Sequence, residues 1–450
     1  MNIFGTDGIR GKVNQWPMTV ELIQKVAISA ASIYFGKGGS NLNRVIIGKD
    51  TRLSGYMLEP ALVAGFTSMG MDCLTLGPIP TPGVSRLTRS FRADLGVMIS
   101  ASHNPSEDNG IKLFGPDGLK LSDSMENKIS SLIRQEIKLA DPSKLGRVRR
   151  LEDAVGRYIE AVKSCIDKNQ RLENLKIVVD CANGAAYKAA PQALFELGAE
   201  VVPINIDPDG FNINKDCGAV YPKNMAHAVI DNNADIGIAF DGDADRLIVS
   251  DEKGNIIDGD QLLAVLAIKL QREGELKNST IVGTSMTNHA FDLWLNNIGI
   301  NLMRTDVGDR YISEAINQFD YSLGGEPSGH ILIPHLSKTG DALMNALIIL
   351  CELVRENKLS SNFFKKFTPI PQTIYNIKGL DKDILDKVEL KEQIHKVIQK
   401  VKEDARVIVR PSGTEKIIRI MVESNNSTLI KSTIGEFEKI FSKYYRYFHF

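Results

Sequence analysis

Short apolar runs that end in polar loops recur three times along the chain, each followed by a helical stretch and a second apolar run. The paired runs are RVIIGKDTR with SMGMDCLTLG, KIVVDCANG with ELGAEVVPI, and TIVGTSMTN with NIGINLMRT. Gly70, Gly198 and Gly299 stand where each helix would end, the usual place of a left-handed C-terminal cap. Continuous apolar runs of this length are typical of strands covered by helices on both faces. The pattern therefore predicts three related α/β domains built on βαβ crossovers.

A further apolar strand follows each unit and ends at a polar loop. The strand ADLGVMIS covers residues 93–100 and ADIGIAFD covers 234–241, while YSLGGEPSGH matches them more weakly. Ligands of α/β sheets bind at the carboxyl ends of the strands. If the units are related, the loops after these strands face a common centre. We therefore expect the loops that contain Ser102, residues 241–245 and residues 326–330 to share one cleft.

Polar stretches divide the chain into four domains. We expect three α/β domains, with mixed sheets around a central cleft, at residues 1–150, 151–253 and 254–368. A smaller α+β domain is expected at residues 369–450, where strand-like and helical runs alternate. The most apolar stretch, ALMNALIILCELV at residues 342–354, is too short to span a bilayer and predicts a buried helix.

The composition narrows the class of protein. The 54 basic and 55 acidic residues give a formal net charge of -1, which provides no general attraction for nucleic acid or for an anionic membrane. We expect neither as a partner. The five cysteines are scattered without a CxxC pair, and the start of the chain has no apolar signal-peptide core. These features predict a cytoplasmic protein without a disulfide framework or a zinc site.

Three aspartates alternate in the loop DGDADR, at Asp241, Asp243 and Asp245. Carboxylates about 4 Å apart repel one another by about 4 kcal/mol per pair at an effective dielectric constant of roughly 20, and a divalent cation removes this repulsion. All-oxygen ligands favour Mg²⁺. An EF-hand is excluded, because Arg246 stands where its loop needs glycine and the strand-like RLIVS follows. The alternative to a metal site is an acidic turn exposed to solvent.

The serine of SASHNP, Ser102, is a candidate to carry a phosphoryl group. The segment lacks the GxSxG motif of a hydrolase, and adjacency in sequence does not place His103 to act as a base. Phosphoryl transfer needs positioning and charge neutralisation rather than a strong base, and a metal held by the aspartates would ligate the phosphate. Arg246 and Lys112 could supply further positive charge. The alternatives are an ordinary turn at SASHNP, an Arg246 paired within its own loop and a Lys112 at the surface.

Two further loops have the composition of a sugar-phosphate site. In RPSGTEKIIR, hydroxyl, backbone N–H and guanidinium donors suit an anion, and the residues are Arg410, Ser412, Gly413, Thr414 and Arg419. The loop is not a P-loop, because GxxxxGK[ST] is absent. In GEPSGH, Glu326 and Ser328 suit sugar hydroxyls, and His330 could transfer a proton near neutral pH. The alternatives are a turn rich in hydroxyl residues and a structural histidine.

FGTDGIRG, SASHNP, DGDADR, GEPSGH and RPSGTE occur in this order along essentially the whole chain, and together they resemble the α-D-phosphohexomutase superfamily. With VDCANGA, GFNIN and VGDRY, they are most similar to its bacterial phosphoglucosamine mutase branch. The resemblance implies four domains, three of them alike and the last similar to the TATA-binding protein fold. It also implies an active phosphoserine at Ser102 and one Mg²⁺ per chain, held there with Asp241, Asp243 and Asp245.

The reaction implied by the resemblance interconverts glucosamine 6-phosphate and glucosamine 1-phosphate, on the way to UDP-N-acetylglucosamine and the cell wall. The phosphoserine gives its phosphate to the sugar, which becomes bisphosphorylated and returns its other phosphate. Glucosamine 1,6-bisphosphate or a related sugar bisphosphate is the implied activator. Arg10 would lie near the reaction centre, Glu326 and Ser328 at sugar hydroxyls, and the loop 410–414 at the distal phosphate. Lys112 and His330 are the candidate acid/base residues.

Other functions stay open at this point. One is a phosphomannomutase/phosphoglucomutase, another a metal-dependent sugar phosphatase, and a third a non-catalytic sugar-phosphate sensor; a homodimer is also left open. Three positions depart from the superfamily pattern: Ala244 stands where glycine is common, Pro327 where a polar residue is common, and Lys416 where proline is usual. Alanine should be tolerated at position 244 unless the turn needs a positive φ there.

Overall fold

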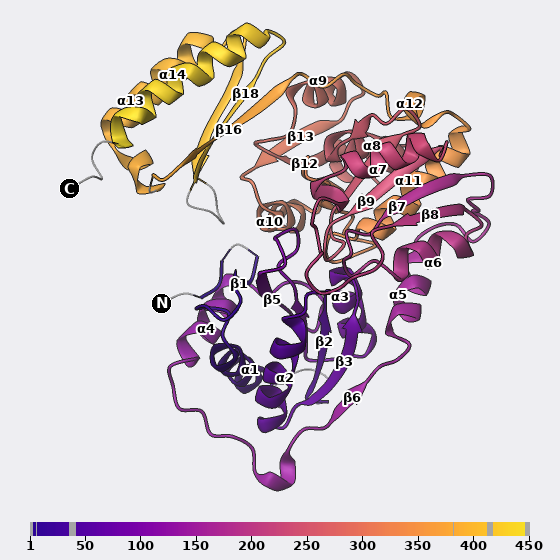
Figure 1. Cartoon of the computed structure of the whole chain (residues 1–450), viewed down its shortest axis with the longest axis vertical. Coiled ribbons are helices and arrows are strands. Elements are labelled where there is room, and N and C mark those ends of the chain that lie inside the picture. Colours follow the sequence, from indigo (N-terminus) through magenta and orange to yellow (C-terminus); the bar gives the residue numbers. More distant parts are fainter. Residues whose placement is uncertain (1–2, 6, 36–41, 381, 412–416, 446–450) are drawn as a thin grey trace.

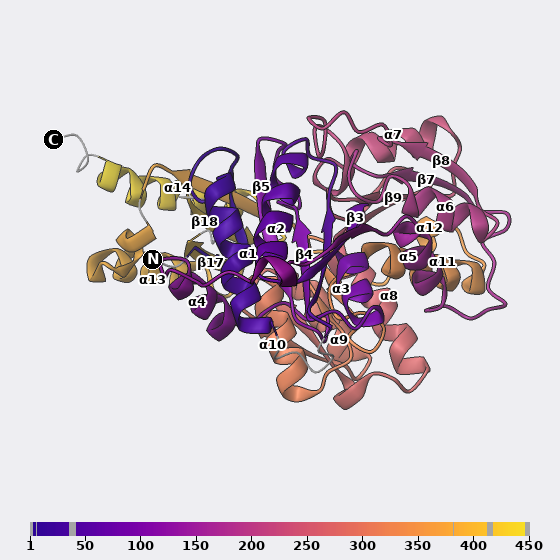
Figure 2. The ribbon, with the colours of Figure 1, turned by 90° about the horizontal axis from the view of Figure 1, so that it is seen from below.

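The computed structural model describes residues 3–5, 7–35, 42–380, 382–411 and 417–445. It has the expected fold class, three α/β units with mixed sheets and a C-terminal α+β unit (Figure 1). Figure 2 shows the second and fourth units at opposite ends, with the first and third between them. The expected phosphate-loop residues Ser412, Gly413 and Thr414, and also Lys416, lie outside the described residues. We keep the domain limits after residues 150, 253 and 368 as a proposal.

The first unit is a six-stranded mixed sheet with helices on both faces. Its elements are β1 (Ile9–Lys12), α1 (Val20–Tyr34), β2 (Arg44–Lys49), α2 (Gly55–Ser68), β3 (Asp72–Pro78), α3 (Thr81–Ser90), β4 (Leu95–Ile99), β5 (Asp108–Phe114), α4 (Asp123–Leu132) and β6 (Val148–Arg150). The strand order is β1-β5-β4-β2-β3-β6, and β5 runs antiparallel to β4 and β1. Val45 and Ile47 pack on the side of α1 and α2, whereas Ile46 packs on the side of α3. The continuous apolar run of β2 is therefore buried on both faces.

The second unit is a five-stranded sheet in the order β11-β10-β9-β7-β8. Its elements are α5 (Ala154–Lys163), β7 (Lys176–Asp180), α6 (Ala189–Glu196), β8 (Glu200–Ile204), α7 (Lys223–Asp231), β9 (Ile236–Phe240), β10 (Leu247–Asp251) and β11 (Ile256–Ile257). Strands β7, β8 and β9 are parallel, and β10 returns antiparallel to β9. The loop between β9 and β10 carries the three aspartates at the carboxyl end of β9.

The third and fourth units differ in the size of their sheets. The third has β13-β12-β14-β15 and the fourth β16-β18-β17, the latter fully antiparallel. Their elements are α8 (Gly259–Arg272), β12 (Thr280–Thr284), α9 (His289–Asn297), β13 (Asn301–Thr305), α10 (Asp309–Phe319), β14 (Gly324–Gly325), β15 (Ile331–Leu332), α11 (Ala342–Glu356), α12 (Ser360–Phe363), β16 (Gln372–Lys378), α13 (Val388–Val401), β17 (Arg406–Pro411), β18 (Ile417–Glu423) and α14 (Ser427–Tyr445).

The predicted helix ends and the predicted buried helix are confirmed. Gly70, Gly198 and Gly299 have φ values of 88°, 94° and 74°, which glycine adopts without a Cβ clash. Helix α11 is buried along nearly all of its length, as its apolar sequence predicts. It belongs to one continuous apolar cluster that also contains Phe114 of the first unit and Ile177 of the second. Among the described residues, no helix is both long and apolar enough to cross a membrane.

Arg406 of β17 connects the fourth unit to the third through hydrogen bonds. Its guanidinium donates to the carbonyl oxygens of Ser285 (2.7 Å) and Thr287 (2.8 Å) and pairs with Glu423 at 2.8 Å. Glu423 is 2% exposed and also accepts from the backbone N–H of His289. These contacts fix the position of β17 and β18 relative to the third unit, and therefore also the position of Arg410 and Arg419 on these strands.

Glu252, just after β10, ties the second unit to the start of α12. Its carboxylate accepts from the hydroxyls of Ser360 (2.7 Å) and Ser361 (2.5 Å) and from the backbone N–H of Ser361 (2.8 Å). Burial raises the pKa of this carboxyl, but the hydrogen bonds from Ser361 and Ser360 outweigh burial and hold the pKa at about 2. The charged carboxylate is therefore the form that stabilises the fold.

We predict that Glu252→Gln destabilises the protein by about 1–3 kcal/mol at neutral pH, because hydrogen bonds to a charged acceptor are lost. The folded-state pKa of about 2 lies below the ordinary value of 4.5, so the stabilisation is present above pH 4.5 and disappears as the pH falls towards 2. Urea denaturation midpoints of wild type and variant, compared between pH 7 and pH 4, test this. A difference in stability that grows on acidification would contradict it.

Candidate active site

Ser102 lies in the loop after β4, with its hydroxyl held in one direction. The residue is 1% exposed and has a φ of 51°, in the left-handed region that a serine rarely adopts. Its carbonyl oxygen accepts from Arg52 Nη2 and from Asn214 Nδ2, both at 2.9 Å, and its N–H donates to Ser100 Oγ at 2.9 Å. The surroundings thus fix a strained backbone, an arrangement found most often at functional sites. An ordinary flexible turn does not describe this segment.

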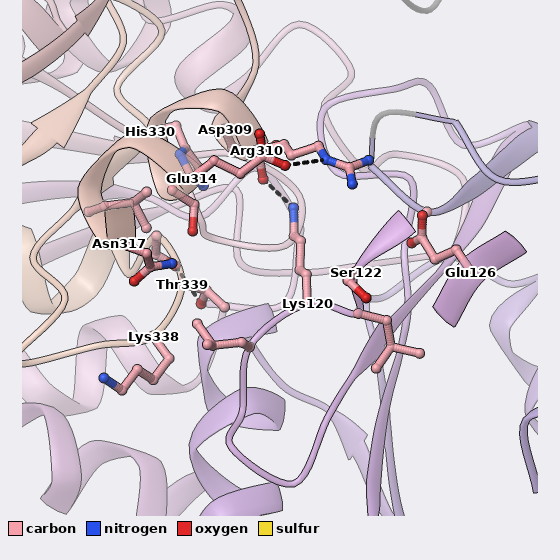
Figure 3. A pocket seen from close by; sticks show the side chains of 16 residues that line it. Lys120, Ser122, Glu126, Asp309, Arg310, Glu314, Asn317, His330, Lys338 and Thr339 are labelled. Carbon is pink, nitrogen blue, oxygen red and sulfur yellow. Dashed lines mark hydrogen bonds and ion pairs between the residues drawn. The ribbon is translucent and has the colours of Figure 1, made fainter. Parts of the chain in front are cut away.

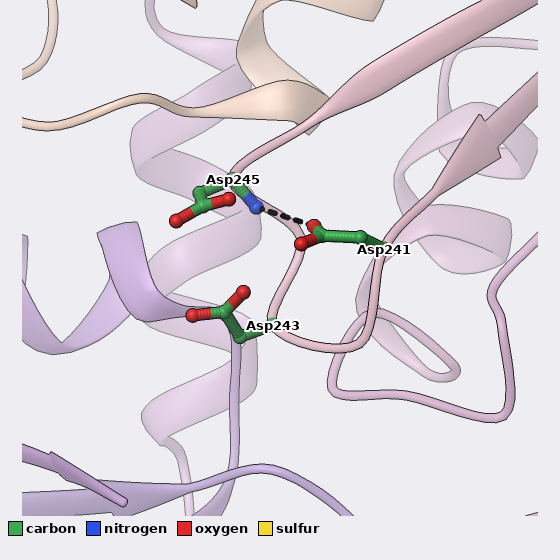
Figure 4. A group of neighbouring side chains, drawn as sticks. All are labelled: Asp241, Asp243 and Asp245. Atoms are coloured by element: carbon green, nitrogen blue, oxygen red, sulfur yellow. Dashed lines mark hydrogen bonds between the residues drawn. The ribbon is translucent and has the colours of Figure 1, made fainter. Parts of the chain in front are cut away.

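The three aspartates gather around one point at the end of β9 (Figure 4). They are at most 5% exposed, and one carboxylate oxygen of each lies within 4.8 Å of the others. Asp241 Oδ2 accepts from the Ser102 hydroxyl at 2.7 Å, although 139 residues separate the two in sequence. A Cβ at Gly242 would lie 2.6 Å from the carbonyl oxygen of Ser102, so glycine is what lets the two loops meet. The aspartates therefore do not form a solvent-exposed turn.

Ala244 occupies the position where the turn requires a positive φ. Its φ is 57°, its side chain is buried, and its N–H donates to the carbonyl oxygen of Asp241 at 3.0 Å. For alanine this conformation costs about 1–2 kcal/mol relative to the right-handed region, a cost that glycine does not carry. Alanine was expected to be tolerated only if the turn did not need a positive φ. The turn does need one, so the fold holds Ala244 in a strained conformation.

The donor set of this cluster fits a divalent cation. Asp243 Oδ1 and Asp245 Oδ1 are buried and have no hydrogen-bonding partner among the described residues. Burial, and then the charges of Asp245 and Asp243, raise the pKa of Asp241 well above its ordinary value. Unpaired buried acceptors and mutual repulsion are what a hard cation with oxygen ligands removes.

Lys112 of β5 lies inside this cluster rather than at the surface. It is 1% exposed, and its Nζ is 2.8 Å from Asp243 Oδ2 and 3.2 Å from Asp245 Oδ2. Burial lowers the pKa of Lys112, but the carboxylates of Asp243 and Asp7 more than compensate, so the pKa is raised well above its usual value. The alternative of an exposed surface lysine is therefore wrong, and Lys112 stays an ammonium.

A cavity of about 470 Å³ opens over the serine and the aspartates. Its walls come from all four units and include most of the residues expected from the sequence: Arg10, Ser102, Asp245, Arg246, Glu326, Ser328, His330, Arg410 and Arg419. The structure therefore brings segments from the start and the end of the chain to one site, as the shared-cleft expectation requires. Asp241, Asp243 and Lys112 lie just beneath this lining.

The sugar loop is held by its own hydrogen bonds at one side of the cavity. Glu326 Oε1 accepts from the backbone N–H of Gly308 at 2.9 Å, and Oε2 accepts from the Ser328 hydroxyl at 3.0 Å. His330 is 5% exposed, and within the described part of the chain its Nδ1 has no hydrogen-bonding partner. Burial, and then the charges of Arg246 and Arg10, lower the pKa of His103 to about 3, so that this second histidine of the cavity stays neutral.

Two arginines of the fourth unit lie side by side in the wall of the cavity. Arg410 of β17 and Arg419 of β18 are cross-strand partners, and both line the cavity. Like charges directly opposite in a sheet are destabilising. Burial, and then the charge of Arg419, lower the pKa of Arg410. An anion between the two guanidiniums would relieve this repulsion, which makes the pair a candidate phosphate site.

Family models match all four units of the chain. The phosphoglucomutase/phosphomannomutase alpha/beta/alpha domains I, II and III match residues 1–140, 156–254 and 258–369, and the C-terminal domain of the same family matches residues 376–439. The chain belongs to the phosphoglucomutase/phosphomannomutase family. The resemblance read from the motifs is thereby confirmed.

Relatives within this family point to one branch. The phosphoglucosamine mutase of Dinoroseobacter shibae is 48% identical over 435 residues, covering 96% of this chain and 97% of the relative. That of Zymomonas mobilis is 50% identical over 431 residues, covering 96% of both chains. The expected similarity to the phosphoglucosamine mutase branch, rather than to phosphomannomutase/phosphoglucomutase, is confirmed.

Solved structures share the fold. A phosphoglucomutase/phosphomannomutase family protein of Burkholderia thailandensis has a TM-score of 0.79 at 22% identity, over 98% of this chain and 97% of its own. Aspergillus fumigatus N-acetylphosphoglucosamine mutase, in complex with GlcNAc-6P and magnesium, has a TM-score of 0.66 at 16% identity, over 97% and 95%. At these identities the likeness supports the family fold alone.

The motifs FGTDGIRG and VGDRY contain two site residues that the sequence alone did not assign, Asp7 and Asp309, and Lys120 is a third such residue outside these motifs. Asp7 of FGTDGIRG pairs with Arg10, Lys112 and Lys120, and Lys120 pairs in turn with Asp309 of VGDRY. A continuous chain of charges thus runs from the aspartate cluster across the boundary between the first and third units. Each motif contains an aspartate close to an arginine, and this was the sequence signal that could have identified Asp7 and Asp309. Only the fold shows that the two motifs lie close together. The hydroxyl of Thr81 donates a hydrogen bond to Asp243, and because Thr81 lies in none of these motifs, no feature of the sequence identified it as a site residue.

We predict that the Lys120–Asp309 pair couples the first and third units energetically. In a double-mutant cycle of Lys120→Met and Asp309→Asn, the two changes should be non-additive by about 0.5–3 kcal/mol, because each single variant removes the same ion pair. Urea denaturation of the four proteins measures the coupling. Lys120→Arg, which keeps the charge, is the matched control. Strictly additive effects would show that the pair contributes nothing to the interface.

Proposed function

We propose that this protein interconverts glucosamine 6-phosphate and glucosamine 1-phosphate through a phosphoserine at Ser102 and a bisphosphorylated sugar. The observation that carries the proposal is the 2.7 Å contact between the Ser102 hydroxyl and Asp241, in a cavity whose wall also contains the arginine pair of the fourth unit. A phosphate donor and an anion site in one cavity suit a sugar phosphate. The phosphoglucosamine mutases at 48% and 50% identity support the choice of substrate.

We propose one Mg²⁺ per chain, held by Asp241, Asp243, Asp245 and the phosphate of Ser102. The two buried carboxylate oxygens without partners support this choice, and so does the preference of Mg²⁺ for oxygen ligands. When bound, the ion would neutralise charge on the phosphoryl group. Lys112, already in contact with Asp243, would add a second positive charge beneath the same phosphate.

The substrate phosphate would bind between Arg410 and Arg419, with Ser412, Gly413 and Thr414 of the same loop as further donors. Glu326 and Ser328 would then hold sugar hydroxyls in the middle of the cavity, and Arg10 and Arg246 would flank the transferring phosphate. This arrangement directs the free end of the sugar, C1–OH or C6–OH, towards Ser102. Positioning of this kind supplies most of the catalysis in phosphoryl transfer.

In the first transfer, the bond from phosphorus to Ser102 Oγ breaks and a bond from phosphorus to the sugar hydroxyl oxygen forms. The sugar hydroxyl loses its proton, and Ser102 Oγ regains one. His330, whose Nδ1 has no hydrogen-bonding partner among the described residues, and Lys112, whose ammonium contacts Asp243, are the candidate acid/base residues. The bisphosphate then exchanges its two ends and returns the other phosphate to Ser102. A sugar bisphosphate added from outside would prime the unphosphorylated enzyme in the same way.

The small-molecule sugar phosphate is the only partner we propose. All five cysteines are free in the structure, three of them with their thiol pKa raised to about 12 by burial. Thiols protected in this way, and a phosphorylated intermediary metabolite as substrate, support a cytoplasmic location.

We predict that Ser102→Ala lowers the rate of isomerisation by at least about 10³-fold, because the phosphate carrier is removed. Wild type incubated with glucose 1,6-bisphosphate should gain one phosphoryl group by intact mass, and the variant should gain none. Ser106→Ala, a hydroxyl deletion in the same loop, is the matched control and should keep both properties.

The same assay separates the alternative functions. A mutase converts glucosamine 6-phosphate without releasing stoichiometric phosphate, whereas a phosphatase releases one phosphate per sugar consumed. A higher kcat/KM on mannose or glucose phosphates would favour a phosphomannomutase/phosphoglucomutase. Isomerisation that survives Ser102→Ala would overturn the phosphoserine mechanism itself.

A further inference from the structure

A second cavity of about 240 Å³ lies between the first and third units (Figure 3). It is walled by the segment from Leu119 to Glu126 on one side and by α10 on the other. Asp309 and His330 line both cavities, and Lys120 stands at their boundary through its pair with Asp309. Nothing in the proposed reaction uses this space.

Among the described residues, Glu126 is the carboxylate in the wall of this cavity that has no ion pair, whereas Asp309 and Glu314 each have one. Glu126 is 8% exposed, and its carboxylate has no hydrogen bond or ion pair within the described part of the chain. In Figure 3 its carboxyl group points across the cavity towards Lys120 and Arg310. A carboxyl group that is largely removed from water and has no counter-charge is less stable in its ionised form.

Both cations next to Glu126 already pair with other carboxylates. Lys120 pairs with Asp7 and Asp309, and Arg310 pairs with Asp123 and Glu314. The ammonium of the third cation in the wall, Lys338, points away from the other labelled side chains in Figure 3. The carboxylates here therefore outnumber the cations that can reach them.

The raised pKa of Glu126 is consistent with a carboxyl group that lacks a close counter-charge. Burial raises its pKa to about 7, the charge of Arg310 lowers the pKa in part, and Asp123 raises it again. A ligand that brings a positive charge to this carboxylate would restore its ionised form.

The rest of the wall suits a small organic molecule. Leu121 and Leu332 are buried and provide an apolar surface, while Ser122, Asn317 and Thr339 provide hydroxyl and amide groups. The volume is below the range of about 300–1,000 Å³ that drug-sized ligands occupy, so the ligand is no larger than a monosaccharide.

We propose that this cavity binds a small hydroxylated organic ammonium compound, with its ammonium group on the carboxylate of Glu126. Such a ligand would bridge α4 and α10 and thereby hold the first unit against the third. The proposal concerns a space separate from the catalytic cavity, and it does not depend on the proposed function.

Calorimetric titration of the full-length protein with unphosphorylated D-glucosamine tests the proposal. The catalytic cavity is kept saturated with glucose 1,6-bisphosphate, so that binding there does not contribute. We expect one site, with binding weakened at least about tenfold by Glu126→Gln, which keeps the shape and removes the charge. D-glucose, which lacks the ammonium group, should bind at least about tenfold more weakly than D-glucosamine.

Glu136→Gln, in the same unit but outside the cavity, is the matched control and should leave binding unchanged. Unchanged thermal midpoint and isomerisation rate in Glu126→Gln would show that the variant is folded. Equal binding of D-glucosamine to wild type and Glu126→Gln would overturn the proposal. So would an equal effect of ammonium chloride, which would assign the site to an inorganic cation, and so would loss of all binding when the catalytic cavity is saturated.

Discussion

The site depends on placing four oxygen-bearing side chains at one buried point: the Ser102 hydroxyl and the carboxylates of Asp241, Asp243 and Asp245. Three carboxylates this close repel one another strongly in a medium that water does not reach. Two features of the fold reduce this repulsion. Lys112 supplies a positive charge from within, and two carboxylate oxygens that have no partner in the described part of the chain are free to bind a cation. The repulsion is thus the reason why a metal and a phosphate suit this point.

Rigid packing makes such a site possible on separate units. One apolar cluster runs from the first sheet through the second unit to α11, so the loops after β4 and β9 cannot drift apart. The close approach of Gly242 to Ser102 fixes their contact, and the positive φ of Ala244 shows that the fold accepts local strain to keep the turn. The fourth unit is attached differently, through the polar contacts of Arg406, and it carries the arginine pair. An arrangement of this kind suits a cavity that must admit a sugar and release it.

Much of the fold was predictable from local pattern. Apolar runs, glycine caps and the repeat of the strand-loop-helix unit identify three α/β domains, because sheets with both faces covered leave a clear trace in the sequence. The grouping of Ser102 with the aspartate loop followed from the internal repeat and from the position of sites at strand ends. The cavity joins these residues to Glu326, His330 and Arg410.

What the sequence could not show are pairings that arise only between domains. Asp7, Lys120 and Asp309 lie in motifs or near them, yet no spacing rule says that a lysine at position 120 meets an aspartate at 309. The burial of Lys112 was equally hidden, since a lysine on a strand gives no sign of which face is covered. The positive φ at Ala244 is a property of the turn, and because alanine usually has a negative φ, the sequence alone does not reveal it.

The most direct test of the central claim is anomalous diffraction from crystals of the Ser102-phosphorylated protein grown with Mn²⁺ in place of Mg²⁺. The account predicts one anomalous peak, with an oxygen of Asp241, of Asp243, of Asp245 and of the serine phosphate each about 2.0–2.3 Å away. A peak elsewhere, or a phosphate directed away from the three aspartates, would contradict it.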